Sequence, residues 1–200
     1  MATAIPRSHA RFTAAEVVRA TGGVLVRGTP EAVATGVETD TRAVLGGDLF
    51  VALRGERHDA HAFLGSATTA GAAGLVVDHD VPWPEGPFVV RVDDTLRALG
   101  DLAGAHRRRL GARVVAITGS VGKTSTKELC AAVLAALGER VHRTEGNLNN
   151  LVGLPRTLLS ADEHTTVVVA ELGMNMPGEI ARLSEIAVPD VGLVTSVAEV

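Results

Sequence analysis

The sequence has very few aromatic side chains and almost no cysteine. Its 200 residues include no tyrosine, one tryptophan and four phenylalanines. The core must therefore be built from aliphatic residues, a composition typical of sheets covered by helices. Cys130 is the single cysteine, so no internal disulfide and no cysteine-based metal cage can form. Cys130 lies in a helical pattern, and we expect it to be a small core residue.

Positive charge and long apolar runs are also lacking. The formal net charge is -4, whereas non-specific nucleic-acid binding needs a basic surface, so no nucleic-acid partner is expected. We expect the cluster 107–109, three arginines in a helical pattern, to satisfy a helix C-terminus. No run approaches the roughly 20 apolar residues that span a bilayer, and residues 1–11 hold no apolar core of signal-peptide length. We therefore expect a cytoplasmic protein without membrane insertion.

The first half of the chain has the pattern of a small mixed α/β domain. Thr13 followed by Glu16 is a capping box that predicts a helix through Ala20, ended by glycines 22 and 23. Short strands are expected at Val24–Val26, Asp48–Leu53, Leu75–Val77 and Phe88–Val92, with helices at Ala60–Ala70 and from Asp93 or Asp94 to about Arg109. Gly111 then marks the expected domain boundary, which divides the chain into residues 1–111 and 112–200.

The second half alternates strands with helices. Strands are expected at Val114–Thr118, from Val141, at Thr165–Ala170 and at Val191–Val194, and helices at Lys123–Leu137 and Gly178–Ile186. Such alternation predicts right-handed crossovers and a parallel sheet. Because a parallel sheet needs both faces covered, and the sequence stops soon after a strand, we expect this sheet to continue beyond Val200.

The most specific feature of the sequence is a glycine-rich turn between a strand and a helix, Gly119-Ser120-Val121-Gly122-Lys123-Thr124-Ser125. The two glycines let backbone N–H groups turn towards an anion, and the helix N-terminus adds its positive end. Lys123 is then placed to reach the terminal phosphates of ATP, and the Thr124 hydroxyl to ligate Mg²⁺. The loop is a short G-x-x-G-K-[ST] form, because Ile117 stands where the longer motif has glycine.

A carboxylate follows the next buried strand. Glu171 comes directly after the expected strand Thr165–Ala170, at the edge where open α/β sheets bind ligands. A carboxylate there can hold the Mg²⁺ that bridges ATP phosphates. The alternative is a helix-capping or solvated glutamate, but the phosphate loop upstream favours the metal role. Lys123 and Glu171 are therefore the expected catalytic residues.

Several further motifs, taken in order, resemble the Mur ligases of peptidoglycan synthesis. The second half carries Thr118–Ser125, Gly146-Asn147-Leu148-Asn149-Asn150, Gly153-Leu154-Pro155, Thr157–Leu159, Glu171–Asn175 and Pro177–Ile180. The first half carries Thr39–Arg42, Gly47–Leu53 and Asp59–Phe63. The resemblance spans nearly the whole chain, although family members are more than twice as long. Departures include Ala60, Thr41, Arg156 and Ser196, which stand where the family more often has glycine, serine, leucine and asparagine.

The resemblance implies a function in cell-wall synthesis. Residues 1–111 would grip the UDP end of UDP-N-acetylmuramoyl-tripeptide, with Thr41 and Arg42 near its diphosphate. The loop of Asn147, Asn149 and Asn150 would hold the muramoyl peptide near the γ-phosphate of ATP. ATP would convert the peptide carboxylate to an acyl phosphate, which the amine of D-alanyl-D-alanine then attacks. We expect the 200 residues alone to bind substrate without ligating it, since a third domain closes the site in this family.

Other functions remain open at this stage. A sister ligase that adds a different amino acid, or a folylpolyglutamate-type synthetase, would share the phosphate loop, although the segment 147–150 speaks against both. A GTPase would need the longer loop and a guanine-reading Asn-Lys-x-Asp stretch, which is not found. The chain could also serve only as a nucleotide-binding module. His58 and His61 are a possible metal pair, but no cysteine or third histidine joins them in the sequence, so local hydrogen bonding is expected.

Overall fold

The computed structural model describes residues 6–55 and 58–197, which form two compact units. One unit is Ser8–Leu102, and the other contains the chain from Ala103 onward. The division falls inside helix α3 (Thr95–Arg109), and the domain boundary expected at Gly111 stays a prediction. The expectations about residues 1–5 and about the sheet beyond Val200 concern positions that lie outside the described residues.

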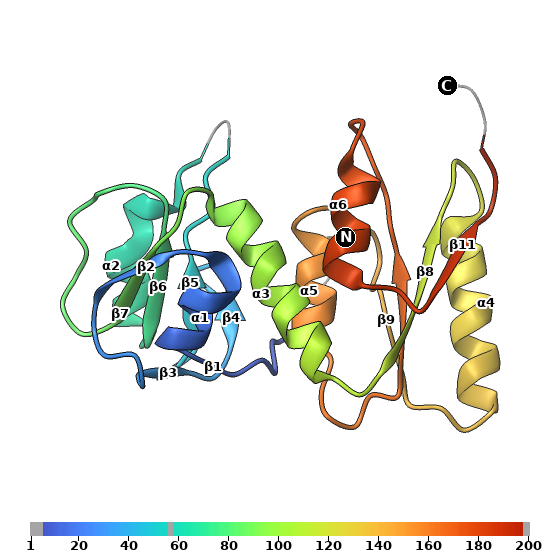
Figure 1. Ribbon diagram of the computed structural model, residues 1–200, viewed down its shortest axis with the longest axis horizontal. Helices are drawn as coiled ribbons and strands as arrows, with labels where there is room; N and C mark the ends of the chain where they lie inside the picture. Colours follow the sequence, from blue (N-terminus) through green and yellow to red (C-terminus); the bar gives the residue numbers. More distant parts are fainter. Residues whose placement is uncertain (1–5, 56–57, 198–200) are drawn as a thin grey trace. The chain divides into compact units, whose positions relative to one another are not determined.

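The first unit is built on a five-stranded sheet with the order β2-β7-β6-β5-β4 (Figure 1). Its strands are β2 (Val24–Arg27), β4 (Val37–Glu38), β5 (Leu49–Val51), β6 (Gly74–Val77) and β7 (Phe88–Arg91). Strand β2 is antiparallel to β7, while the other pairs are parallel. The mixed sheet confirms the mixed α/β character expected from the sequence. The two-residue strands β1 (Phe12–Thr13), β3 (Val33–Ala34) and β4 were not predicted, because so short a run carries no periodicity.

Helix α1 (Ala14–Thr21) begins and ends as its sequence predicts. The Thr13 hydroxyl accepts from the Glu16 backbone N–H at 3.2 Å, and the Glu16 carboxylate accepts from the Thr13 N–H at 2.8 Å. Gly22 closes the helix at a φ of 70°, where its N–H donates to Val18 O. The capping box is therefore confirmed as the local cause of this helix.

The helix expected over Ala60–Ala70 is in fact two short elements. A 3₁₀ turn η1 (Ala60–Phe63) precedes helix α2 (Leu64–Thr69). The tight first turn follows from the Asp59 side chain, which accepts the His61 N–H at 2.9 Å and satisfies that donor. Leu64 then enters the aliphatic core of this unit beside Phe50 and Leu75, all at most 2% exposed.

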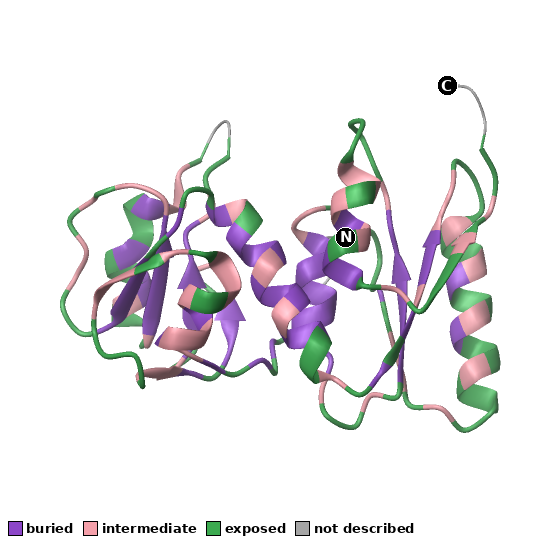
Figure 2. Ribbon diagram, in the orientation of Figure 1, coloured by how far each residue is buried: buried purple, intermediate pink, exposed green. Residues whose placement is uncertain are grey.

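The second unit is built on a parallel sheet with the order β11-β8-β10-β9. Its elements are β8 (Arg113–Thr118), α4 (Lys123–Ala136), β9 (Val141–Arg143), α5 (Gly153–Leu159), β10 (Val167–Glu171), α6 (Glu179–Ala187) and β11 (Val191–Val194). Within this unit, α4 covers one face of the sheet, and α5 and α6 cover the other (Figure 1). Strand β10 is central and buried along its whole length (Figure 2). The parallel α/β prediction is confirmed.

Two details of this unit differ from the sequence-based expectation. Helix α5 was not predicted; its Pro155 is the third helical residue, where no intrahelical N–H bond is lost. Arg107 does satisfy a helix C-terminus, but not that of its own helix. Its guanidinium donates to Ala187 O at 3.1 Å and to Val188 O at 3.3 Å, at the end of α6.

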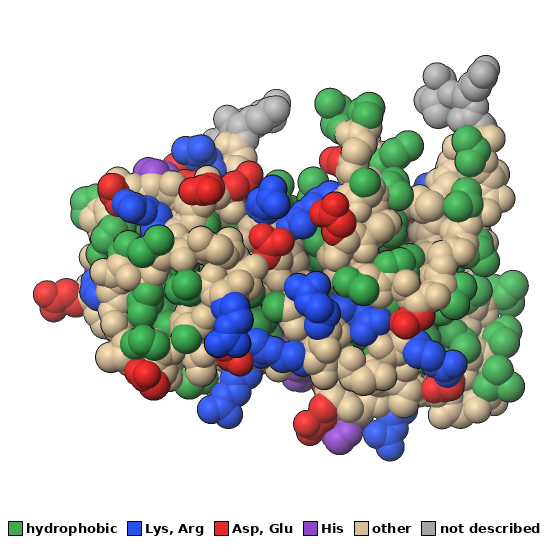
Figure 3. Space-filling model, viewed as in Figure 1, with side chains coloured by type: hydrophobic (Ala, Val, Ile, Leu, Met, Phe, Trp, Pro, Cys, Tyr) green, Lys and Arg blue, Asp and Glu red, His purple; other side chains and the backbone are tan. Residues whose placement is uncertain are grey.

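The outer face of α4 is apolar and uncovered within the described residues. Leu129, Val133 and Leu137 are spaced by four residues and are 66%, 51% and 76% exposed. Figure 3 shows hydrophobic side chains gathered over this helix. In the described part of the chain, no helix has the length and hydropathy needed to cross a bilayer.

Candidate functional site

The turn between β8 and α4 is a glycine-dependent loop. Gly119 has a φ of 137° and Gly122 a φ of 90°, values that side chains rarely adopt. A Cβ at Gly119 would also lie 2.2 Å from Thr195 Oγ1 and 2.8 Å from Ser196 O. The loop conformation and its close neighbours therefore both require glycine at position 119.

Residues after β11 brace this loop from the side. The Ser120 N–H donates to Ser196 O at 2.8 Å, and the Thr195 hydroxyl donates to Val121 O at 2.7 Å. The Ser196 hydroxyl accepts from the Val121 N–H at 3.2 Å. The sequence did not identify Thr195, and noted Ser196 only as a departure from the family. A prediction that β11 pairs in parallel with β8 would have identified both residues, because the carboxyl ends of the two strands then lie at the same edge of the sheet.

The N-terminus of α4 faces this loop. Gly122 is the N-cap residue, and no side chain of the described chain caps the helix. Its first backbone N–H groups and its dipole are therefore available to an anion. Lys123 Nζ donates to Gly119 O at 2.7 Å, so the ammonium contacts the first residue of the glycine loop.

Glu171 lies at the centre of the predicted site. It is the last residue of β10 and is only 2% exposed. Its Oε2 accepts from the Thr124 hydroxyl at 2.9 Å, and its Oε1 accepts from Asn149 Nδ2 at 2.8 Å. The structure thus joins side chains from α4, β10 and the loop before α5, each of which the sequence had singled out separately.

The three asparagines of the loop 147–150 are placed differently from one another. Asn149 contacts Glu171 directly, and its backbone N–H donates to Asn147 O at 2.8 Å. Asn150 Oδ1 accepts from the N–H groups of Val152 and Gly153, at 3.1 and 2.8 Å, at the start of α5. The side chain of Asn150 therefore supports the loop itself.

Two buried residues beside Glu171 were missed by the sequence analysis. Thr144 is fully buried, and its hydroxyl accepts from the Glu171 N–H at 2.9 Å. Lys127 is 1% exposed and donates from Nζ to Thr144 O at 2.7 Å. The position of Lys127, four residues after Lys123 on one helix, was the signal that could have found it.

Thr41 and Arg42, the expected diphosphate contacts, belong to the other unit. The Arg42 side chain is 88% exposed and pairs with Asp40 at 2.6 Å. The hydrogen bond from Arg42 to Asp40, together with their charge attraction, raises the pKa of the guanidinium above its ordinary value. Arg42 is thus a charged group at the surface whose nearest anion comes from its own loop.

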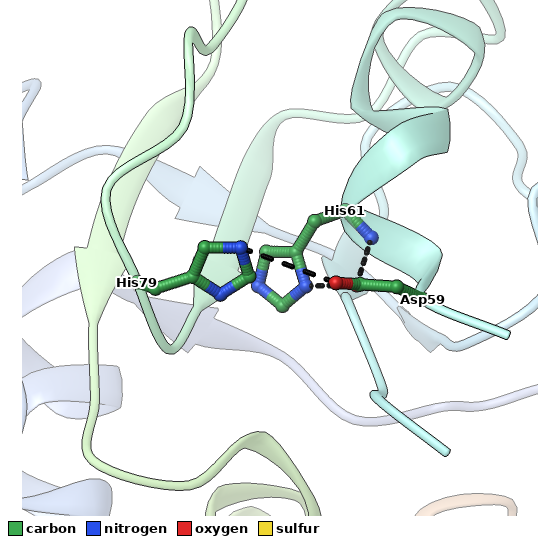
Figure 4. Close-up of side chains that lie close together, drawn as sticks. All are labelled: Asp59, His61 and His79. Carbon is green, nitrogen blue, oxygen red and sulfur yellow. Dashed lines mark hydrogen bonds and ion pairs between the residues drawn. The ribbon is translucent and has the colours of Figure 1, made fainter. Parts of the chain in front are cut away.

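The same unit contains the buried imidazole of His61, for which we expected local hydrogen bonds. His61 Nδ1 lies 2.6 Å from Asp59 Oδ1 (Figure 4). His61 Nε2 accepts the Asp78 N–H at 3.2 Å, so the expected local hydrogen bonds are confirmed. The expectation that no further histidine joins His61 is wrong, because the centroid of the His79 ring lies 4.2 Å from that of the His61 ring. Asp59, His61 and His79 each offer one possible ligand atom, and these atoms lie within 4.8 Å of one another, but the Nε2 lone pair of His61 accepts the Asp78 N–H in this arrangement. Burial acts to raise the pKa of the Asp59 carboxyl. The hydrogen bonds from the His61 backbone and ring have a larger combined effect, and the pKa of Asp59 lies below its ordinary value.

A glycine loop between a parallel strand and a helix N-terminus, with a carboxylate at the end of the neighbouring strand, defines a phosphate-binding nucleotide domain. Residues 117–200 match the family model of the Mur ligase middle domain. This match confirms the resemblance to the Mur ligases that the motifs indicated.

Known proteins resemble the chain over most of its length. The UDP-N-acetylmuramoyl-tripeptide–D-alanyl-D-alanine ligase of Bacillus subtilis (strain 168) is 48% identical over 165 residues, covering 82% of this chain and 36% of that protein. MurF from Acinetobacter baumannii superposes with a TM-score of 0.86 at 35% identity, covering 94% of this chain and 41% of that one. The MurF ligase from Thermotoga maritima in complex with ADP gives a TM-score of 0.73 at 32% identity, covering 80% of this chain and 37% of that one. The chain thus spans between 36% and 41% of the length of these relatives.

Proposed function

We propose that this chain provides the nucleotide loop and the nucleotide-sugar unit of an ATP-dependent ligase. The ligase would join D-alanyl-D-alanine to UDP-N-acetylmuramoyl-tripeptide through an acyl phosphate, as the names of its relatives suggest. A reaction that consumes ATP and a nucleotide-linked precursor of peptidoglycan belongs in the cytoplasm, where we propose that it takes place.

The observation that carries this proposal is the contact between Thr124 and Glu171 at the mouth of the loop. Thr124 is the second residue of α4, next to Lys123, and its hydroxyl lies 2.9 Å from the Glu171 carboxylate. Phosphate groups held by the uncapped helix end would therefore lie beside both oxygen atoms. A glycine-rich turn without a phosphate role would have no need of a buried carboxylate at this position.

The pair also fits a magnesium ion. Mg²⁺ prefers hard oxygen ligands in an octahedron, and ligands at neighbouring corners lie about 2.9 Å apart for bonds of about 2.0–2.1 Å. The hydroxyl of Thr124 and Oε2 of Glu171 supply two such oxygens at 2.9 Å. When bound, Mg²⁺ would neutralise charge on the ATP phosphates.

The other side chains have roles that follow from their chemistry. Lys123, whose ammonium now contacts Gly119 O, would turn to the terminal phosphates and stabilise the charge that moves onto them. Asn149, held against Glu171, would orient the muramoyl peptide beside the phosphate, with Asn147 and Asn150 shaping the same loop. Thr41 and Arg42 would contact the diphosphate of the nucleotide sugar, since a planar guanidinium binds phosphate in a bidentate manner.

A binding and ligation experiment tests this proposal. Calorimetry would measure binding of ATP with Mg²⁺, and of UDP-N-acetylmuramoyl-tripeptide, to the 200-residue chain. Ligation would be followed as phosphate release from a chimera in which these residues replace the matching part of the Bacillus subtilis relative. We expect release only when both the tripeptide substrate and D-alanyl-D-alanine are present.

The acceptor specificity separates this function from its alternatives. Release with a single amino acid in place of D-alanyl-D-alanine would indicate a sister ligase. Binding of nucleotide by a folded chimera that releases no phosphate with any acceptor would leave only a binding module, and would contradict the proposed ligase.

A further inference from the structure

Lys127 is a buried cation that the proposed function has not used. It lies on α4 one turn after Lys123 and is among the largest fully buried side chains of the described chain, at 1% exposure. Its Nζ contacts Thr144 O at 2.7 Å and Glu128 Oε1 at 2.9 Å. Burial of an ammonium is unfavourable, and an apolar side chain of similar size would often serve stability better. The position therefore calls for a reason beyond packing.

Thr144, the partner of Lys127, is held by three separate hydrogen bonds. Its backbone N–H donates to Val169 O at 3.1 Å, its carbonyl accepts from Lys127, and its hydroxyl accepts from the Glu171 N–H at 2.9 Å. It is fully buried and directly follows β9. Thr144 thus fixes the end of β10 at the residue that carries the carboxylate.

Two residues of α4 are connected to Glu171 by hydrogen bonds, one to its side chain and one to its backbone. Thr124 and Lys127 are three residues apart and so share one face of the helix. Thr124 contacts the Glu171 side chain directly, and Lys127 contacts the Glu171 backbone through Thr144. Side chain and main chain of Glu171 are therefore both tied to the helix whose N-terminus faces the loop.

We propose that Lys127 and Thr144 are positioning residues that hold the Glu171 carboxylate at the distance from Thr124 needed to bind Mg²⁺ with the nucleotide. The inference rests on the proposed function, because it assigns Glu171 to the metal. Partners that orient a metal ligand contribute strongly to metal affinity, since a ligand that must first be ordered binds more weakly.

Isosteric variants test the inference. Thr144→Val removes the hydroxyl while keeping the shape, Thr144→Ser keeps the hydroxyl, and Lys127→Met removes the buried charge. Binding of ATP to the 200-residue chain is titrated with Mg²⁺ for each variant. We expect Thr144→Val and Lys127→Met to raise the Mg²⁺ concentration for half-maximal binding about tenfold, with ATP affinity at saturating Mg²⁺ within about twofold of wild type, and Thr144→Ser to restore the wild-type requirement.

A matched control separates positioning from general loss of stability. Ser160→Ala removes another buried hydroxyl of the same unit, which donates to Thr157 O at 2.9 Å. The hydrogen bonds described for this hydroxyl involve Thr157 and His142, not Glu171. The variant should lower the melting temperature without changing the Mg²⁺ requirement. Circular dichroism verifies that each variant is folded, and the Thr144→Val and Thr144→Ser pair decides the question if Lys127→Met does not fold.

The possible failures are distinguishable. A wild-type chain that binds no ATP in the presence of Mg²⁺ would overturn the proposed function, and this inference with it. Wild-type binding with an unchanged Mg²⁺ requirement in folded Thr144→Val would overturn the positioning role alone. A shift of equal size in Ser160→Ala would also overturn it, because the effect would then reflect stability.

Discussion

The hydroxyl of Thr124 donates a 2.9 Å hydrogen bond to Oε2 of Glu171, which lies 47 residues further along the chain. The two residues come from the start of α4 and the end of β10, two elements that pack against each other. Asn149 holds the other carboxylate oxygen at 2.8 Å, so the carboxylate is fixed in one orientation. This arrangement brings a hydroxyl oxygen and a carboxylate oxygen together at the edge of the sheet that carries the glycine loop.

Substitution of Lys123 by alanine should impair catalysis far more than folding. The ammonium contacts only the loop carbonyl of Gly119 among the hydrogen bonds described for it, and its main effect should appear as charge shifts between phosphate oxygens. We expect phosphate release by the chimera to fall roughly 100-fold or more, with a melting temperature near that of wild type. Lys123→Arg is the matched control for charge alone, and near-normal release by Lys123→Ala would exclude this loop from the reaction.

Glu171→Gln should weaken metal binding while keeping the shape of the site. The amide can still accept from Thr124 and occupies the same volume, but it lacks the negative charge that Mg²⁺ requires. Titration of ATP binding with Mg²⁺ should show a requirement increased about tenfold or more. Binding of UDP-N-acetylmuramoyl-tripeptide should change little, and an unaltered Mg²⁺ requirement would assign Glu171 a purely structural role.

The capping box of α1 gives a prediction on stability alone. Thr13→Ala removes the oxygen that accepts the Glu16 N–H and should lower the free energy of unfolding by about 1 kcal/mol. Thr29→Ala, at an exposed position, is the control and should change stability by less than about 0.5 kcal/mol. Urea denaturation of the three proteins measures the difference. Equal stability of Thr13→Ala and wild type would show that the box does not stabilise this helix.

The ion pair of Lys127 with Glu128 predicts a dependence of stability on pH. The hydrogen bond from Lys127 lowers the pKa of Glu128 below its ordinary value of 4.5, against an opposing effect of burial. A carboxyl with a depressed folded-state pKa stabilises the protein above its unfolded-state pKa, and that contribution is lost as the pH falls through the folded value. Its size should be about 1 kcal/mol, because the carboxylate is half exposed and screened by water.

Comparison of wild type with Glu128→Gln measures this contribution. The variant should be less stable at pH 7, and the difference should shrink as the pH falls below 4.5. Glu163→Gln, at a side chain that is 87% exposed, is the control for removal of one surface charge. If the difference in the free energy of unfolding between wild type and Glu128→Gln stayed constant from pH 7 to the acid limit, the stabilising role of the Lys127–Glu128 ion pair would be contradicted.

Local signals were sufficient for much of the fold. The capping box and Gly22 set both ends of α1, and β11 has the bounds that its apolar run predicts. Strands β1, β3 and β4 could not be predicted, because a two-residue strand exists only through its partner and has no pattern of its own. Helix α5 was hidden by Pro155, whose effect depends on whether it falls in the first turn.

The amino-acid sequence specifies which chemical groups the site contains and which local turn presents them. The glycine loop, Lys123 and Thr124 are adjacent in the chain, so their relation follows from the strand-to-helix junction alone. The contacts of Glu171 with Thr124 and Asn149 arise only when the chain folds. The same is true of the hydrogen bonds that link Lys127, Thr144 and Glu171. Those contacts join residues 17 to 47 positions apart. The parallel order of β8, β10 and β9 creates them, by bringing the carboxyl ends of separate strands to one edge.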